Sequence, residues 1–513
     1  MAAQTVTPTT TTSSSDSIVI LGAGIIGVST AYYLSQQQQQ QQQEDASEPR
    51  PAIHLVEPSP ELFASASGYA GGFLARDWFA PAAAALGALS FDEHRRLAER
   101  EDGARRWGYA PSTSVSVSYA PAGGRRPRDG MDGCAEGAGA EAGAVADVWC
   151  REGGSRAAVA SGVSGGDGGK GKGKGDESAP AWLRRREGDE VVVISEEGTV
   201  AQVDPLQLCQ FLLEKCLSAG VQLHHPSRAL SVVTDPTTGA LTGLRITTTT
   251  AATAPDAAPR TLPCTALVLA AGAWTPSVFS ELFPASPLRL PISSLAGHSL
   301  VVENNKYKGW TTNSPSPLSP PAQERSRCHA VFLAHAPPNT VGDDAEEEEE
   351  DDDDEDGATT TTTTYAPELF SRAAGSIYVA GLNSSAEPLP PLPTDAKARV
   401  SARALARLRA TAREVLGAEE GEEGEEIRVL REGLCFRPVT RGGTPIVGRV
   451  PDGGAGMPAG GGAAVYVAAG HGPWGISMGL GTGRVVAEMV RGRPLSADVA
   501  GLGVGEACGM GER

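Results

Sequence analysis

SIVILGAGIIGVSTA (residues 17–31) combines an apolar run, a glycine-rich turn and the beginning of a helix. Residues 18–21 are continuously apolar, which is typical of a parallel strand buried on both faces. Three glycines then follow the pattern G-x-G-x-x-G, which gives a tight turn, a close approach of the backbone to a pyrophosphate, and close helix packing. The helix predicted over residues 25–34 would direct its positive end at that pyrophosphate. The stretch predicts a dinucleotide site at Gly22, Ala23, Gly24, Ile25, Ile26 and Gly27.

A second apolar run, residues 53–56, ends in Glu57, an acidic residue suited to hold a ribose hydroxyl. Glu57 lies farther from the glycines than the usual interval of about 20 residues. The glutamine run at residues 36–43 and its acidic tail separate them, and we interpret this tract as an insertion. Together, the two runs favour dinucleotide binding over the alternative of a purely structural turn.

Length and composition limit the function classes. A chain of 513 residues can hold two domains or one closely mixed pair. The net charge of -19 comes largely from one acidic run and argues against a nucleic-acid partner. Eight cysteines without metal-ligand spacing predict neither a metal site nor a disulfide framework. We see no apolar run long enough for a membrane span and no secretory signal, so a cytoplasmic location is the default expectation.

Low-complexity tracts interrupt the folded blocks. Residues 1–16, 120–176 and 337–364 are predicted to be disordered, because they lack apolar periodicity and are rich in small or charged residues. Between them, residues 266–274 read as a buried strand that ends in small residues around Gly272 and returns the chain to the dinucleotide.

The C-terminal part holds a second informative block. Residues 435–448 predict a strand carrying Cys435 and Arg437, then a turn and a short strand. Residues 465–476 then lead into a final helix, residues 477–490, whose N-terminus is again suited to an anion.

These blocks together resemble the FAD-dependent oxidoreductases of the D-amino-acid oxidase type, which include glycine oxidase and sarcosine oxidase. The matching segments lie at both ends and in the middle of the chain and skip the low-complexity tracts. The resemblance implies an α/β fold, α+β overall. It implies a discontinuous Rossmann-like FAD-binding domain (residues 17–95, 199–289 and 433–513) and a substrate domain with an antiparallel sheet (residues 96–198 and 290–432).

The same resemblance implies FAD as the cofactor and assigns residues to it. The glycine turn and Glu57 would hold the ADP half, with Val232 or Val233 near the adenine. The flavin ring would lie against Ala70, Gly71 and Gly72. Its pyrimidine end would face the segment that contains Gly470, Gly472, Trp474, Gly475 and Ile476.

Four side chains are candidates on the substrate side. Arg437 matches the family arginine that binds a substrate carboxylate, and the alternative is a salt-bridged sheet arginine. Cys435 matches the cysteine that bonds covalently to the flavin in sarcosine oxidase, or it is a buried strand cysteine. His471 would supply positive charge for oxygen activation or cap the last helix. Tyr378 would offer a hydroxyl group or belong to the core.

The predicted function is FAD-dependent oxidation of the C–N bond of an amino acid or N-methyl amino acid, by hydride transfer to flavin N5. Oxygen or another acceptor would reoxidise the flavin. Tyr69 stands where the family usually has asparagine or lysine, which leaves the substrate open. The alternative is an FAD-binding regulatory or interaction protein without amine oxidase activity that acts through its low-complexity insertions.

Overall fold

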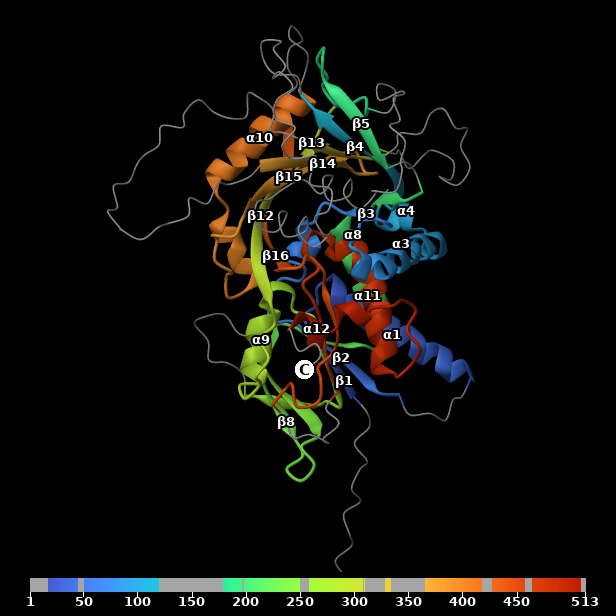
Figure 1. The fold of residues 1–513 in the computed structure, drawn as a ribbon, viewed down its shortest axis with the longest axis vertical. Coiled ribbons are helices and arrows are strands. Elements are labelled where there is room, and N and C mark those ends of the chain that lie inside the picture. Colours follow the sequence, from blue (N-terminus) through green and yellow to red (C-terminus); the bar gives the residue numbers. More distant parts are fainter. Residues whose placement is uncertain are drawn as a thin grey trace, which may run out of the picture.

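The computed structural model describes residues 17–44, 50–119, 179–195, 198–249, 258–307, 309, 328–333, 365–417, 427–456 and 464–508. The three segments predicted to be disordered lie outside these residues. Figure 1 shows two main parts, a nine-stranded sheet with α10 (Ala402–Leu416) at the top and a six-stranded sheet containing β1 and β2 below it.

The six-stranded sheet forms around β1 (Ser17–Leu21), which is buried along its whole length as its apolar sequence predicts. The strand order is β17-β18-β11-β1-β2-β7, and every pairing is parallel except β17 with β18. The other five strands are β2 (Ala52–Val56), β7 (Gln222–His224), β11 (Ala266–Leu269), β17 (Ile446–Arg449) and β18 (Ala464–Ala469). This order confirms the Rossmann-like prediction.

Helix α1 (Ile25–Glu44) begins directly after the glycine turn, but it is longer than predicted. The glutamine run continues the helix instead of leaving it, because glutamine has a high helix propensity. Gln38 also fastens the extension by donating a hydrogen bond to the carbonyl of Pro51 at 2.8 Å. The run is therefore an extension of α1 as far as Glu44.

The nine-stranded sheet has the order β16-β12-β15-β14-β13-β4-β6-β3, with β5 paired to β4. It is antiparallel except where β13 runs parallel to β4, a difference from the wholly antiparallel prediction. The strands are β3 (Phe73–Ala75), β4 (Ala110–Ser118), β5 (Glu190–Ser195), β6 (Val200–Gln202), β12 (Ile292–Glu303), β13 (Cys328–Leu333), β14 (Tyr365–Ser371), β15 (Ser376–Ser384) and β16 (Arg428–Thr440). The boundary predicted at residue 433 falls inside β16.

Two helical stretches are divided in the structure. Helix α3 (Pro81–Glu101) is followed by α4 (Gly103–Arg106), with a break at Asp102, whose φ is 55°. Helix α10 is preceded by a 3-10 turn, η3 (Pro393–Arg399). Helix α10 packs apolar residues such as Leu408 against one face of the nine-stranded sheet.

The remaining elements surround these sheets. Helix α8 (Pro205–Ser218) carries Cys209 and Cys216, both fully buried as predicted for core residues. A third, three-stranded sheet consists of β8 (Ser227–Thr234), β9 (Leu241–Thr248) and β10 (Arg260–Pro263). The other helices are α2 (Ala66–Tyr69), η1 (Gly272–Trp274), α9 (Thr275–Leu282), η4 (Gly472–Trp474), α11 (Gly475–Val490), η5 (Ala500–Leu502) and α12 (Val504–Ala507).

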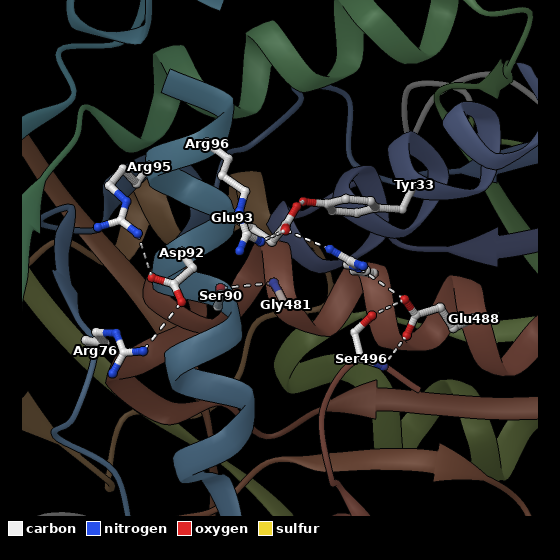
Figure 2. Close-up of polar contacts among 11 residues, drawn as sticks. Tyr33, Arg76, Ser90, Asp92, Glu93, Arg95, Arg96, Gly481, Glu488 and Ser496 are labelled. Carbon is white, nitrogen blue, oxygen red and sulfur yellow. Dashed lines mark hydrogen bonds and ion pairs between the residues drawn. The ribbon is translucent and has the colours of Figure 1, made fainter. Parts of the chain in front are cut away.

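A polar network holds α11 against α1 and α3 (Figure 2). Glu93 accepts hydrogen bonds from the Tyr33 hydroxyl and from Arg96 Nη1, both at 2.7 Å, and from Arg484 Nη1 at 2.8 Å. Arg484 also donates through Nε to Glu488, 3.1 Å away. Glu93 is buried, so its negative charge needs these donors. The network also fixes the position of α11, because Arg484 of this helix is one of the donors.

Candidate active site

A cavity of about 780 Å³ lies where the two main sheets meet. Its walls come from the turn after β1, the ends of β2 and β11, helix α2, the beginning of β8, strand β16 and the segment between β18 and α11. Elements far apart in the sequence therefore converge on one elongated space.

The glycine turn has the geometry that its sequence predicts. Gly22 has φ of 101°, and a Cβ there would lie 2.5 Å from the carbonyl oxygen of Ala270. A Cβ on Gly27 would overlap the carbonyl of Gly22, so the close packing of α1 requires glycine. Gly24 faces the cavity, beside Ser67, whose Oγ accepts a hydrogen bond from Ile25 N at 2.9 Å. Ser67 thus helps satisfy the N-terminus of α1.

Glu57 lies in the cavity wall at the end of β2. Its carboxylate accepts a hydrogen bond from Ala23 N and another from Ser59 N, each at 2.9 Å. Burial raises the pKa of this carboxyl, an effect that the two backbone donors oppose. Each carboxylate oxygen can accept a second hydrogen bond, which suits the predicted contact with a ribose hydroxyl.

The adenine side differs from the prediction. Val232 and Val233 do not line the cavity, because only the beginning of β8 reaches it. The wall there is formed by Ser227, Arg228 and Ala229.

The segment before α11 contributes some of the expected residues and not others. Gly472, Gly475 and Ile476 line the cavity, whereas Gly470 and Trp474 do not. Trp474 instead packs into an aromatic cluster that includes Phe79. Across the cavity, Gly272 also lines the wall, and a Cβ added there would meet no atom within 4 Å.

His471 lines the cavity. Burial lowers its pKa to about 3, which favours the neutral imidazole, and the positive charge expected for oxygen activation stays a prediction. Its Nε2 lies 3.0 Å from Thr482 Oγ1, and it makes no side-chain cap to the helix, which was the other prediction. Its buried Nδ1 has no hydrogen-bond partner in the protein.

A second cavity, of about 40 Å³, adjoins the first. Gly71, Gly72 and Tyr378 line this smaller space and not the larger one. Ala70 and Arg437 line both cavities, so they mark the junction. The smaller cavity extends the larger one toward the nine-stranded sheet.

The backbone of residues 70–72 is held from both sides. Arg372 Nη2 donates to the carbonyl of Ala70 at 3.0 Å, and Gln202 Nε2 donates to the carbonyl of Gly71 at 2.6 Å. A Cβ on Gly71 would overlap the ring of Phe370. The segment can therefore present its backbone to a flat ligand without a side chain in between.

Arg437 lies on β16 with its guanidinium group over Gly297 of the neighbouring strand β12. Its Nη1 donates to Asn383 Oδ1, so this partner is a neutral amide and not the carboxylate of the salt-bridge alternative. Burial acts to lower the pKa of Arg437, but nearby groups including Glu368 outweigh it, and the pKa is raised. The cation is thus stable at the cavity junction.

Cys435 and Tyr378 are both buried beside Arg437. Cys435 lines the larger cavity, and burial raises the pKa of its thiol. Burial also raises the pKa of Tyr378, whose ring stacks on Phe370 with the planes 2° apart. Both side chains are therefore protonated at neutral pH.

Sequence reasoning missed several residues that line or support the site. Ser67, Asn383 and Glu368 line it, and Arg372 supports its backbone. Only Glu368 has a local sequence signal that could have revealed it, because it is a buried glutamate within the mainly apolar sequence of β14.

The fold and the cavity define a dinucleotide-dependent oxidoreductase architecture, with a Rossmann-like sheet and a second sheet over one cavity. Residues 17–158 and 179–489 match the family model described as FAD dependent oxidoreductase (DAO), and the chain belongs to this family. The chain is an FAD-dependent oxidoreductase.

Individual relatives agree with this assignment. A Schizosaccharomyces pombe protein, named as a proposed oxidoreductase, is 24% identical over 453 residues, which cover 86% of each chain. Among solved structures, the fold is similar to iminodiacetate oxidase from Chelativorans sp. BNC1 (TM-score 0.57, 17% identity, 95% of this chain and 98% of that chain). It is also similar to glycine oxidase from Geobacillus kaustophilus (TM-score 0.57, 17% identity, 95% and 97%). L-proline dehydrogenase from P. horikoshii matches with a TM-score of 0.58 at 12% identity (97% and 98%).

The family binds FAD, and the cavity fits this cofactor. Its volume is in the range of cofactor sites, and two helix N-termini, those of α1 and α11, border it. Three buried polar atoms in its wall, Ser59 Oγ, Ser65 Oγ and His471 Nδ1, have no hydrogen-bond partner among the described residues and are available to a ligand.

Two negative findings hold for the described residues. No helix among them is long and apolar enough to cross a membrane. They also contain no group of three or more histidine, cysteine or acidic side chains suited to a metal ion.

Proposed function

We propose that this oxidoreductase oxidises the C–N bond of a small amino acid or N-methyl amino acid. The observation that carries the proposal is the half-buried guanidinium of Arg437 at the junction of the two cavities. An arginine can bind a carboxylate through two parallel hydrogen bonds, and this geometry fixes the orientation of a bound amino acid. The names of the oxidase relatives are compatible with such a substrate.

We assign the ADP half of FAD to the glycine turn and to Glu57, and the flavin ring to the space bordered by Ala70, Cys435 and the beginning of α11. When bound, FAD accepts a hydride at N5 and passes the electrons to oxygen or another acceptor. The discontinuous FAD-binding domain predicted from the sequence is part of this proposal.

The protein contributes mainly orientation and charge. Asn383 accepts from Nη1 of Arg437, and Tyr378 also forms a hydrogen bond with the guanidinium. A guanidinium has five N–H donors, so donors remain for a substrate carboxylate. A substrate held in this way would be oriented for transfer of its Cα hydrogen to the cofactor, and such positioning can supply much of the rate. The N-terminus of α11 can stabilise negative charge on the ring by about 0.3–2 kcal/mol.

The first test is the absorption spectrum of the purified protein before and after acid precipitation. A yellow supernatant means releasable FAD, whereas a yellow pellet means a covalent flavin and would make Cys435 the candidate for attachment. The protein is then mixed anaerobically with a panel of small amino and N-methyl amino acids. We expect at least one of them to bleach the flavin, and a flavin that none of them reduces would contradict the proposal.

The role of Arg437 is tested with Arg437→Gln. We expect a loss of about 100-fold or more in the reduction rate at low substrate, because a charge-assisted bidentate contact is removed. Arg428→Gln is the matched control, since Arg428 lies on the same strand but is exposed and pairs with Glu303. The alternative regulatory function rested on insertions that lie outside the described residues.

A further inference from the structure

The smaller cavity carries opposite charges in its wall. Arg437 and Glu368 both line it, and they interact electrostatically. Tyr378 and Asn383 line the same space. An elongated ligand there would meet a cation and an anion at once.

Glu368 reaches this cavity because of the strand register. It pairs with Ala380 in β15, and Phe370 pairs with Tyr378 two residues further along. Side chains two apart share a face, so Glu368 lies on the same face as Phe370 and Tyr378. Leu369, between them, packs on the opposite face in the cluster that includes α10.

Glutamate side chains are rarely buried in proteins, but that of Glu368 is. The Glu368 side chain is 9% exposed and lies in a strand whose seven residues are all buried. Arg437 interacts electrostatically with Glu368 and also lines the larger cavity, where it is available to a ligand.

We propose that Glu368 binds the cationic amino group of the substrate while Arg437 binds its carboxylate. This inference rests on the proposed function and narrows the substrate class to small zwitterionic amino acids. A zwitterion matches both charges, whereas a hydroxy acid or a simple carboxylate leaves Glu368 unmatched.

The size of the cavity agrees with a small substrate. Its volume of about 40 Å³ compares with about 780 Å³ for the larger cavity. Two of the walls are the backbone of Gly71 and Gly381, where a Cβ would already overlap neighbouring atoms. Beyond its carboxylate and amino group, a substrate therefore has little room for a side chain on this side.

The test compares two ligands that differ only in the amino group, glycine and acetate. The FAD-loaded wild type, Glu368→Gln and Glu368→Asp are titrated anaerobically, and the change of the flavin spectrum gives the dissociation constants. Glu190→Gln is the matched control, because Glu190 is exposed on β5 of the same sheet. Thermal midpoints of all variants show whether each one is folded.

We expect Glu368→Gln to weaken glycine binding about 10- to 100-fold, the range for a charge-assisted hydrogen bond. Acetate should bind as well as before or more tightly, because the repulsion from Glu368 is gone. Glu368→Asp should restore part of the glycine affinity. Equal weakening of both ligands, or no change in either, would overturn the inference, since a merely structural glutamate does not distinguish them. A wild type that binds no glycine would overturn it as well.

The two proposals fail in different ways. If Glu368→Gln selectively weakens glycine but no amine reduces the wild-type flavin, the proposed reaction is wrong and the binding role of Glu368 stands. If amines reduce the wild-type flavin and Glu368→Gln leaves the half-saturating amine concentration unchanged, the proposed reaction stands and the proposed role of Glu368 is wrong.

Discussion

Gly297 is the position where a single methyl group should disturb the site without disturbing the fold. Gly297 lies on β12 beneath the Arg437 guanidinium. A Cβ there would lie 2.5 Å from Nη1, 2.8 Å from Cζ and 2.9 Å from Nη2 of Arg437. The backbone of Gly297 has no positive φ, so alanine itself is acceptable at this place. The atoms that must move belong to the end of a flexible side chain.

The size of the effect follows from these distances. Ordinary contact to a Cβ begins at 3.4 Å, so in Gly297→Ala the guanidinium must move by about 1 Å. A displacement of about 1 Å in a positioning group can cost about 100-fold in rate, or about 3 kcal/mol of transition-state stabilisation. The free energy of unfolding should change by less than about 1 kcal/mol, because no backbone or core atom is displaced.

The assay is anaerobic flavin reduction over a range of concentrations of the best substrate from the panel, together with thermal unfolding. We expect a large rise in the half-saturating concentration and an almost unchanged melting temperature. Gly243→Ala is the control, since it adds a Cβ to a glycine of β9 outside both cavities. The double variant Gly297→Ala with Arg437→Gln should be no worse than Arg437→Gln alone, because the two changes act through one side chain.

Two results would refute this reasoning. If Gly297→Ala lowers activity as strongly in the Arg437→Gln background as in the wild type, the methyl group acts through something other than Arg437. If Gly297→Ala leaves the half-saturating substrate concentration unchanged while Arg437→Gln abolishes saturable reduction, the guanidinium tolerates the displacement. Its orientation over Gly297 then does not matter for binding.

Three further predictions concern stability and cofactor binding. His94 donates Nε2–H to the carbonyl of Ile476 at 2.9 Å, and burial lowers its pKa to about 4. As the pH is lowered, the unfolded state, with a histidine pKa near 6.5, therefore binds a proton before the folded state does. The free energy of unfolding should decrease by about 1.4 kcal/mol per pH unit between about pH 6.5 and 4 from this residue alone. In His94→Gln, denaturant unfolding at several pH values should show a slope reduced by this amount, and an unchanged slope would contradict the assignment. Glu93→Gln should cost about 2 kcal/mol because three donors lose a charged acceptor, whereas Asp92→Asn should cost less than about 1 kcal/mol, because the Asp92 side chain is itself more exposed than that of Glu93. Equal melting temperatures for these two variants would refute the comparison. Glu57→Gln should weaken FAD binding about tenfold, since an amide cannot accept from both backbone donors. Flavin fluorescence measures the affinity, and an unchanged affinity would contradict a role of Glu57 in the cofactor site.

The part of the site around the glycine turn could be predicted from sequence because its determinants are local. The strand, turn and helix of residues 17–31 are contiguous, and both the positive φ of Gly22 and the close packing of Gly27 on the Gly22 carbonyl arise within this short unit. The length of α1 could not be predicted in the same way. A glutamine run is compatible with a helix or a loop, and the contact of Gln38 with Pro51 depends on tertiary structure.

Strand β14 was missed for a physical reason. Its sequence, YAPELFS, contains a proline and a glutamate, which interrupt the alternation expected of a strand. The ladder with β15 is irregular between Tyr365 and Glu368, and this irregularity accommodates Pro367 inside a sheet. The proline that interrupts the alternation of β14 therefore lies in the irregular part of the ladder, directly before Glu368, which lines the smaller cavity.

Gly297 in β12 extends this argument to the other side of the site. It carries no turn signature in the sequence and has no positive φ. Its role is set by the Arg437 guanidinium, which would collide with a side chain there. The sequence revealed Arg437, which contributes a functional group, but not Gly297, whose contribution is the absence of a side chain. A reading of this family from sequence alone will therefore find the cofactor half of the site before the substrate half.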